Sequence, residues 1–486
     1  MSTAASGSAG SPGAFLPSPP PPPGSAERPW APVCTNVLDL IGNTPMLEVQ
    51  HLDTGPCRLF LKLEAWNPGQ SIKDRIAVAM IEDAEREGRL TPGGTIVEGT
   101  AGNTGIALSL VALQKGYRVI VVVPDKMSEG KISHLRAMGA QVRLTRSDVE
   151  KGHPEYYQDL ARSIAEETPG SVYINQFGNP ANPDAHERTT GPEIWHQLGG
   201  RVDAFCTGVG SGGTMSGVGR YLRSKNPDVE LVLADPVGSI LTPLVNEGRH
   251  VSPGSWLVEG IGEDFVPDIL ELDLVNIAYA VSDQEAFETA RALLKSEGIL
   301  AGSSSGTLVA AALRYCRDQT EPKNVVTFVC DSGAKYLDKM FNDFWMIDQG
   351  FLERETFGDL RDLIARRHQA REDFVAAPNT PVIQAVKQMR LYDVSQMVVV
   401  DEQDAVVGLI DESDMLLSVM HDQASFHRPI SDFMTRRIET IRPTASVNDL
   451  IPIFRADRVA VVADEQGYYG LITRIDLLNY LRKQLA

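Results

Sequence analysis

The sequence predicts an α/β protein whose core is a mostly parallel sheet, followed by a smaller α+β module. Short apolar runs alternate with amphipathic stretches from Val37 to about Gly350. Several of these runs end in Gly-rich turns, and the chain after residue 370 contains an internal repeat. Strands that alternate with helices imply a parallel sheet with its ligand-binding loops at the carboxyl edge.

Length and charge exclude several classes of protein. The 486 residues include 45 Lys and Arg against 64 Asp and Glu, a net charge of −19, which disfavours nucleic-acid binding. At about 150 residues per domain the chain allows about three domains. No run of 18 apolar residues occurs, so no membrane span is expected. The five cysteines are widely spaced without a CxxC, so we expect no metal site and a cytoplasmic location.

Composition divides the chain into five segments. The first, residues 1–35, is rich in Ser, Gly and Pro and is expected to be a disordered tail. Residues 36–350 are expected to form the α/β domain, and the charged stretch 351–370 is expected to be a linker. The repeat then supplies two small domains, 371–428 and 429–486.

The local patterns support these assignments element by element. Residues 119–124 predict a strand buried on both faces, and the helix before it is expected to close at Gly116. Segments 202–214, 229–236 and 324–333 each predict a strand followed by a turn. In the repeat, residues 397–416 are echoed by 459–478. Each copy predicts helix, strand, turn, strand and helix, and the two copies can cover each other's sheets.

A glycine pattern, Gly208-x-Gly210-x-x-Gly213, follows one predicted strand and opens a helix. Asp235 stands 22 residues after Gly213, which satisfies the dinucleotide fingerprint and keeps a nicotinamide-dependent oxidoreductase as one hypothesis. The same backbone donors at a helix N-terminus bind any phosphate, however. The turn Gly210–Thr214 therefore predicts a phosphate cup without naming its ligand.

Lys73 follows a glycine-bearing turn and stands at the start of a predicted helix. The ordinary interpretation is a solvated lysine, but a cation at a helix N-terminus opposes the helix dipole. The conflict disappears if the amine is neutral or bound as an imine. A lysine desolvated in a pocket has a lowered pKa and is a nucleophile toward aldehydes.

Two further Gly- or Ser-rich turns precede helices, in Glu98–Gly105 and Ala301–Leu313. Alone, each is consistent with a capped helix. Pyridoxal phosphate is one ligand that would unite all the turns with Lys73. In that hypothesis the lysine holds the aldehyde, the phosphate cup takes the phosphate, and the other turns take the ring and a substrate carboxylate.

The order and the residues of these motifs resemble those of the β-family (fold type II) of pyridoxal-phosphate enzymes, the cysteine synthase and cystathionine β-synthase family. The resemblance covers about Val37 to Phe351 and rests on IGNTPM, NPGQSIKDR, TAGNTG, GSGGT and SSSG. It implies a two-lobed, tryptophan-synthase-β-like core. ADPVGSI, VEGIGEDFVP and CDSGAKYLDKMFNDFWM are similar to the cystathionine β-synthase branch. The repeat resembles that branch's tandem CBS-domain (Bateman) pair.

The resemblance assigns roles residue by residue. It implies Lys73 as the Schiff-base lysine and general base, and Glu259 as an acid for the thiol-acceptor half of the reaction. The cofactor-binding residues that it implies are Lys73, Asn103, Gly210, Ser211, Gly212, Gly213, Thr214 and Ser304, with Asn103 at the ring hydroxyl and Ser304 at the pyridine nitrogen. The substrate-binding residues that it implies are Thr100, Ala101, Asn103, Thr104, Gln176 and Gly260.

The implied reaction is β-replacement, in which L-serine and L-homocysteine give L-cystathionine and water, in the transsulfuration route to cysteine. Cysteine synthase with a regulatory tail, using O-acetylserine and sulfide, is the alternative. Ala101 stands where the family usually has Ser, and Phe177 where cystathionine β-synthases often have Tyr, so both substrates stay open. Cys34 has no nearby His, so we expect no haem. The family implies amino-acid substrates and a homodimer or homotetramer.

The repeat suggests a regulatory nucleotide site. Thr473 and Asp476 fit the Gly-x-x-Thr-x-x-Asp ending that binds adenosyl ligands in CBS domains, while Asp411 replaces the Thr in the first copy. We expect one site near Val394, Thr473 and Asp476, for S-adenosylmethionine or AMP/ATP. A purely structural dimerisation module is the alternative, and a catalytically inactive sensor is disfavoured by the intact Lys73 motif.

Overall fold

The computed structural model describes residues 33–100, 102–125, 127, 129–149 and 151–483. Residues 1–32 of the expected tail, and the predicted substrate residue Ala101, lie outside the described residues. The chain forms two compact units, the first ending at Lys335 and the second beginning at Tyr336. Within the described residues, no helix has the length and hydropathy that crossing a membrane requires. The same residues contain no cluster of His, Cys, Asp or Glu suited to a metal ion.

The larger sheet of the first unit consists of β1 (Met46–Glu48), β2 (Arg58–Leu63), β7 (Ala204–Thr207), β8 (Glu230–Pro236), β9 (Ile277–Val281) and β10 (Asn324–Val329). Their spatial order is β1-β2-β10-β7-β8-β9. All neighbouring pairs are parallel except the antiparallel edge pair β1–β2. The carboxyl ends of these parallel strands therefore lie along one edge, where the predicted motifs begin.

The smaller sheet consists of β3 (Thr95–Gly99), β4 (Arg118–Pro124), β5 (Gln141–Thr145) and β6 (Ser171–Tyr173). It is wholly parallel, with the order β5-β4-β3-β6. Every residue of β4 after Arg118 is buried, as predicted for a strand covered on both faces.

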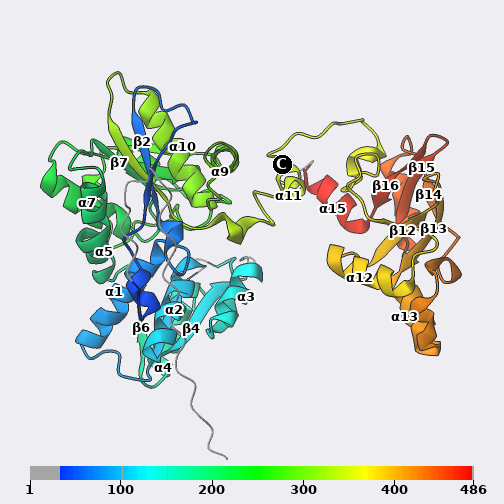
Figure 1. The fold of residues 1–486 in the computed structure, drawn as a ribbon, viewed down its shortest axis with the longest axis horizontal. Helices are drawn as coiled ribbons and strands as arrows, with labels where there is room; N and C mark the ends of the chain where they lie inside the picture. Colours follow the sequence, from blue (N-terminus) through cyan, green and yellow to red (C-terminus); the bar gives the residue numbers. More distant parts are fainter. Residues whose placement is uncertain (1–32, 101, 126, 128, 150, 484–486) are drawn as a thin grey trace, which may run out of the picture. The chain divides into compact units, whose positions relative to one another are not determined.

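Helices cover both sheets of the first unit (Figure 1). They are α1 (Lys73–Arg86), α2 (Asn103–Lys115), α3 (Glu129–Ala137), α4 (Tyr157–Glu167), α5 (Ala181–Ala185), α6 (Gly191–Gln197), α7 (Gly213–Lys225), α8 (Leu241–Glu247), α9 (Asp283–Glu297) and α10 (Ser303–Arg317). The predicted end of α2 is confirmed, because Gly116 adopts the left-handed conformation at φ 76°. A π-helix, His186–Thr190, joins α5 to α6.

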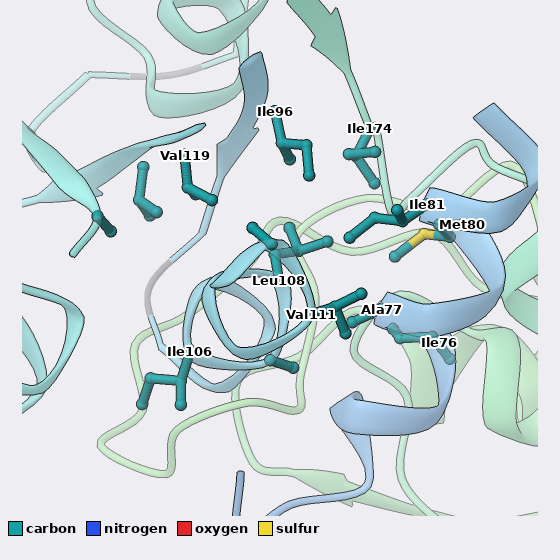
Figure 2. Close-up of a cluster of buried hydrophobic side chains, with 14 of the residues drawn as sticks. Ile76, Ala77, Met80, Ile81, Ile96, Ile106, Leu108, Val111, Val119 and Ile174 are labelled. Carbon is teal, nitrogen blue, oxygen red and sulfur yellow. The ribbon is translucent and has the colours of Figure 1, made fainter. Parts of the chain in front are cut away.

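A hydrophobic core lies between the smaller sheet and helices α1 and α2. Figure 2 shows Ile96 of β3 and Leu108 and Val111 of α2 in one cluster with Ala77 and Ile81 of α1. All five side chains are fully buried. Burying one Leu or Ile stabilises the fold by roughly 1.5–3 kcal/mol. This burial holds α1 and α2, the helices that begin at Lys73 and Asn103, against the sheet.

The second unit confirms the internal repeat. Its strands are β11 (Val375–Ala376), β12 (Gln396–Val400), β13 (Val406–Asp411), β14 (Thr440–Ile441), β15 (Ala460–Asp464) and β16 (Gly467–Ile472). Each copy has a parallel pair followed by an antiparallel pair, and the antiparallel pair carries a register shift at matching positions. Val398 and Val400 of the first copy pack against Val461 and Tyr468 of the second.

The helices of the second unit are α11 (Asp343–Asp348), α12 (Val382–Tyr392), α13 (Glu412–His421), α14 (Leu450–Arg455) and α15 (Arg474–Lys483). The segment 351–370, expected to be a linker, contributes Leu360, Leu363 and Ile364 to the core of the second copy. Gly470 permits this packing, because a Cβ there would lie 2.4 Å from Ile364 Cγ2. Charged residues surround these three apolar positions, which is why composition alone suggested a linker.

Candidate active site

Lys73 is the first residue of α1, as predicted, and it follows a loop that pairs with the end of β10. The Ile72 N–H donates to the Cys330 carbonyl at 2.9 Å, and Ser71 forms a bridge with Asp331. Desolvation lowers the pKa of Lys73, while the nearby Cys330, Asp331 and Glu263 act against that shift. The amine makes no hydrogen bond to the described residues. A desolvated amine of this kind is suited to nucleophilic and proton-transfer chemistry.

The predicted phosphate cup follows β7 and opens α7. Gly212 has φ +89°, and a Cβ on Gly213 would lie 1.9 Å from Asn182 Oδ1. A Cβ on Gly210 would lie 2.6 Å from the Gly260 carbonyl oxygen. The turn therefore requires glycine at each position, and its backbone donors lie at the N-terminus of a 13-residue helix. The Ser211 hydroxyl accepts from Asn182 Nδ2 at 2.9 Å.

A buried histidine that the sequence did not point to lies behind this cup. His186 Nε2 is 3.2 Å from the Thr214 hydroxyl, and His186 Nδ1 is 2.9 Å from the Thr190 hydroxyl. Desolvation, with repulsion from Arg75 and Lys73, holds the pKa of His186 well below its usual value. The imidazole is therefore neutral, and it connects the phosphate cup to the π-helix. No motif marked it, because the contact depends on how α5 packs on α7.

Asn103 is the first residue of α2, and its amide is held on both sides. Nδ2 donates to Asp331 Oδ2 at 2.9 Å, and Oδ1 accepts from Lys335 Nζ at 2.7 Å. Asp331 and Lys335 follow β10 of the larger sheet, so the contact links that sheet to the start of α2. It brings Asn103 to the side of the site where Lys73 lies.

Three of the predicted substrate-binding residues lie together. Thr100 and Thr104 are buried, and the Thr104 hydroxyl donates to Gln176 Oε1 at 2.7 Å. The Gly102 N–H reaches the Thr100 hydroxyl at 3.4 Å. Their hydroxyl and amide groups, at the start of α2, form a suitable environment for an anion.

The start of α10, which contains Ser304, meets the segment with Glu259 and Gly260 near the phosphate cup. Ser304 is the second residue of α10, is buried, and hydrogen bonds to the Cys330 thiol. The Glu259 N–H donates to the Ser303 hydroxyl at 3.1 Å, and the Glu259 carboxylate forms an ion pair with Lys131 of α3. Sequence reasoning missed Lys131, because 128 residues separate the pair.

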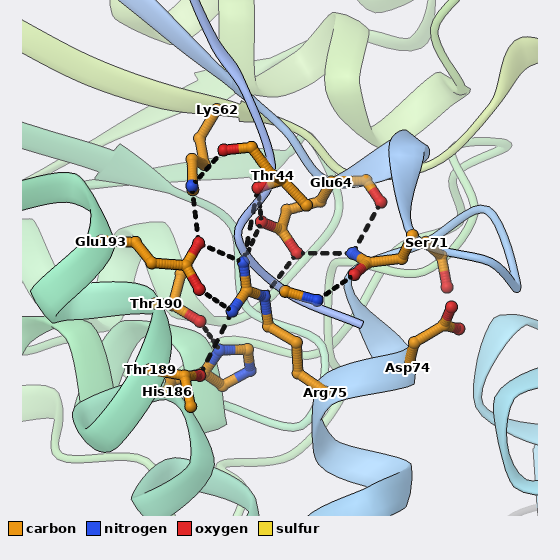
Figure 3. Close-up of polar contacts among 12 residues, drawn as sticks. Thr44, Lys62, Glu64, Ser71, Asp74, Arg75, His186, Thr189, Thr190 and Glu193 are labelled. Atoms are coloured by element: carbon orange, nitrogen blue, oxygen red, sulfur yellow. Dashed lines mark hydrogen bonds and ion pairs between the residues drawn. The ribbon is translucent and has the colours of Figure 1, made fainter. Parts of the chain in front are cut away.

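A network of buried ion pairs holds the first turn of α1 through Arg75 (Figure 3). Arg75 forms ion pairs with Glu64 and Glu193, both at 2.7 Å, and Lys62 pairs with Glu193 at 2.7 Å. Both Lys62 and Glu64 are fully buried. Because Arg75 is two residues after Lys73, this network holds the first turn of the helix that carries Lys73.

Asp235, the acidic residue of the dinucleotide fingerprint, is committed elsewhere. Its Oδ2 accepts from both the N–H and the hydroxyl of Thr242 at 2.9 Å, and the side chain is fully buried. It therefore serves as a structural cap between β8 and α8. This geometry removes the feature on which the nicotinamide hypothesis depended.

The three predicted regulatory residues lie in the second unit. Asp476 Oδ2 accepts from the Thr473 N–H at 2.7 Å and from its hydroxyl at 2.5 Å, which caps α15. In the first copy the bond has the opposite direction along the chain, because the Asp411 side chain at the N-cap of α13 accepts from the Asp414 N–H at 2.8 Å. A pocket of about 380 Å³ includes Val394 in its lining, but neither Thr473 nor Asp476 lines it.

Comparison with known families matches two models to the chain. "Pyridoxal-phosphate dependent enzyme" covers residues 37–331, and "CBS domain" covers 361–421 and 430–483. Among solved structures, an O-acetylserine dependent cystathionine beta-synthase from Helicobacter pylori is 38% identical with a TM-score of 0.59. It covers 64% of this chain and 99% of its own.

Curated relatives extend the likeness over most of the chain. Cystathionine beta-synthase of Oryctolagus cuniculus is 34% identical over 92% of this chain and 85% of its own length. That of Saccharomyces cerevisiae is 33% identical over 92% and 97%. Cysteine synthase 1 of Neurospora crassa is 42% identical over 66% of this chain and 86% of its own. The chain therefore belongs to the pyridoxal-phosphate-dependent enzymes of the cystathionine beta-synthase family, with a catalytic core followed by a pair of CBS domains.

Proposed function

We propose that this enzyme catalyses pyridoxal-phosphate-dependent β-replacement, joining L-serine to L-homocysteine to give L-cystathionine and water. The observation that carries the proposal is the extent of the likeness. Curated cystathionine beta-synthases match at 31–34% identity over 92–93% of this chain, including its CBS pair. The match to cysteine synthase 1 covers 66% of it.

The residues of the first unit suit the cofactor that this family uses. Gly210–Thr214 would hold the phosphate by backbone N–H groups and by the hydroxyls of Ser211 and Thr214. Asn103 would face the ring hydroxyl, and Ser304 the pyridine nitrogen. The fit rests on the cradle itself, since a Cβ at Gly210 or Gly213 would collide with neighbouring atoms. Bound at Lys73, pyridoxal phosphate supplies an electron sink for a carbanion at the substrate Cα.

The chain's own side chains would bind, orient and exchange protons. Thr100, Thr104 and Gln176 would bind the α-carboxylate and so fix the substrate Cα in front of Lys73. With its pKa lowered by desolvation, the Lys73 amine would take the proton from Cα and later return it. A neutral hydroxyl at Ser304, in place of a carboxylate, would not hold a proton on the pyridine nitrogen.

Glu259 and Lys131 would serve the second half of the reaction. Their ion pair is nearly buried, with side-chain exposures of 13% and 5%. The Lys131 amine also approaches Gly102, where a Cβ would lie 3.5 Å from Nζ. A carboxylate and a cation at this position would orient an incoming amino-acid thiol and hold its proton.

The test is product formation by the purified full chain. Serine with homocysteine is expected to give cystathionine, detected by mass spectrometry, and Lys73→Ala is expected to give none. Cysteine from serine and sulfide alone, without cystathionine, would overturn the proposal. An absorption spectrum with no haem band would support the expectation that Cys34 holds no haem.

A second candidate is cysteine synthase, using O-acetylserine and sulfide. Phe177 favours it: the residue follows Gln176, and its ring packs on Phe265 at 5.5 Å, so this wall of the site is apolar where a tyrosine would place a hydroxyl. Turnover of O-acetylserine and serine, each with sulfide and with homocysteine, separates the two reactions by product.

For the second unit we propose one adenosyl-ligand site near Val394, Thr473 and Asp476. Desolvation raises the pKa of Asp476, while its bonds from Thr473 act against that shift. A ribose would have to share or displace those bonds. Calorimetry with S-adenosylmethionine, AMP and ATP tests the site, and no heat with any of them favours a structural module. We also propose a homodimer or homotetramer, to be tested by light scattering.

A further inference from the structure

Lys335 brings its ammonium to the centre of three segments that surround the site. It lies in the single helical turn Gly333–Tyr336 that follows β10, and its side chain is half-buried. Its Nζ donates to Asn103 Oδ1 at 2.7 Å and approaches the carbonyl oxygens of Gly69 and Gln70 at 3.4 Å. One amine therefore touches both the start of α2 and the loop that leads into Lys73.

The amide of Asn103 is oriented by two partners of opposite character. An ammonium only donates hydrogen bonds, so Lys335 must face the amide oxygen. A carboxylate only accepts, so Asp331, at 2.9 Å, must face the amide nitrogen. Together they define which way the amide points. They use one of its two N–H groups and leave the other for a ligand.

Burial and nearby carboxylates act on the Lys335 ammonium in opposite directions. Desolvation and repulsion from Lys131 lower the pKa of Lys335, and attraction to Asp331 and Asp74 acts against both. Asp74 follows Lys73 and accepts from the Gly69 N–H at 2.5 Å. Overall the pKa of Lys335 is lowered, so it is the hydrogen bond to Asn103 and the approach to the Gly69 and Gln70 carbonyls that define where the amine lies.

We propose that Lys335 is a positioning residue for the cofactor: it holds Asn103 so that the free amide N–H faces the ring hydroxyl. The inference rests on the proposed function, because that function makes Asn103 a cofactor ligand. It assigns Lys335 no contact with the reacting atoms. Its effect on cofactor affinity must therefore depend on Asn103. A residue that merely stabilised the fold would affect affinity whether or not Asn103 were present.

Cofactor binding to the apoprotein measures this role directly. We compare Lys335→Met and Lys335→Arg with Lys323→Met, which removes a half-buried lysine bonded to Glu230 and Tyr315 in the same unit. Lys335→Met is expected to raise the pyridoxal phosphate Kd about tenfold or more, the size expected for a charge-assisted hydrogen bond. It is also expected to change the circular dichroism of the bound cofactor. Lys335→Arg should restore most of the affinity, and Lys323→Met should leave Kd unchanged.

A double-mutant cycle with Asn103→Ala tests whether the effect of Lys335 on cofactor affinity depends on Asn103. If Lys335 acts through Asn103, Lys335→Met adds nothing in the Asn103→Ala background. Wild-type Kd and spectrum in Lys335→Met, or additive effects in the cycle, would overturn the inference. If Lys335→Met does not fold, Lys335→Gln takes its place in the cycle. A wild-type chain that binds no pyridoxal phosphate would instead overturn the proposed function.

Discussion

The Thr104 hydroxyl donates a hydrogen bond to Gln176 Oε1 at 2.7 Å, joining the start of α2 to the turn that follows β6. Both side chains are buried, at 2% and 5% exposure. The bond engages the amide oxygen of Gln176, so its NH₂ group stays available as a donor. This pairing prepares a donor for a carboxylate before any substrate arrives.

The first prediction concerns that donor. Gln176→Ala is expected to raise the KM for serine about tenfold, the value of one hydrogen bond to a charged group. We expect kcat to fall less, because the substrate carboxylate changes little during the reaction. Steady-state kinetics measures both, and Gln319→Ala, which removes a bond to the Tyr315 carbonyl at the far end of α10, is the control. An unchanged KM would contradict the role of Gln176.

The second prediction concerns Lys73. Lys73→Ala is expected to abolish turnover and the visible chromophore that borohydride reduction fixes to the protein, because one amine serves as anchor and base. Mass spectrometry after reduction should place the added mass on the peptide with Lys73 in the wild type only. Unaltered far-ultraviolet circular dichroism would show that the variant is folded. Full activity of the variant would contradict the assignment.

The third prediction concerns the phosphate cup. Gly213→Ala would place a Cβ 1.9 Å from Asn182 Oδ1, so α7 or Asn182 must shift. We expect at least about a tenfold loss of cofactor affinity, since roughly one charge-assisted bond is misplaced. Gly130→Ala, in α3, meets no atom within 4 Å and is the matched control. Equal cofactor Kd values in the two variants would contradict the steric argument.

The fourth prediction concerns acid stability. Desolvation favours a raised pKa at Glu193, but hydrogen bonds and attraction from Arg75 and Lys62 outweigh it and lower the pKa from 4.5 to about 2. A carboxyl with a depressed folded-state pKa stabilises the fold above its unfolded value, and this stability is lost as the pH falls through the folded value. The contribution should therefore disappear between about pH 5 and pH 2.

Denaturation of the wild type and of Glu193→Gln across that range measures the contribution. The difference in unfolding free energy between the two should be largest above pH 5 and should shrink toward pH 2. Glu247→Gln, which removes an exposed partner of Arg249, should show little difference at any pH. A constant wild-type-to-variant difference for Glu193→Gln would mean that its pairing is not what lowers its pKa.

Local sequence patterns predicted much of the fold because their causes are local. Gly116 ends α2 in a left-handed conformation that glycine adopts without strain. The apolar run that became β4 is long enough and uniform enough to specify a strand covered on both faces. The segment 351–370 shows the limit of such patterns, because its three core residues are scattered among charges and are recognised only by what they pack against.

The sequence by itself determined the α/β class, the repeat and the helix-opening positions of Lys73, Asn103 and the Gly210–Thr214 turn, since turn residues and hydrophobic period depend on residues that are neighbours in the chain. Only the tertiary structure decided how those groups are held. Asn103 meets Asp331 across 228 residues, and Lys131 meets Glu259 across 128. The protonation of His186 and the orientation of the Asn103 amide follow from burial and from partners distant in the chain. Those depend on packing, which no local pattern records.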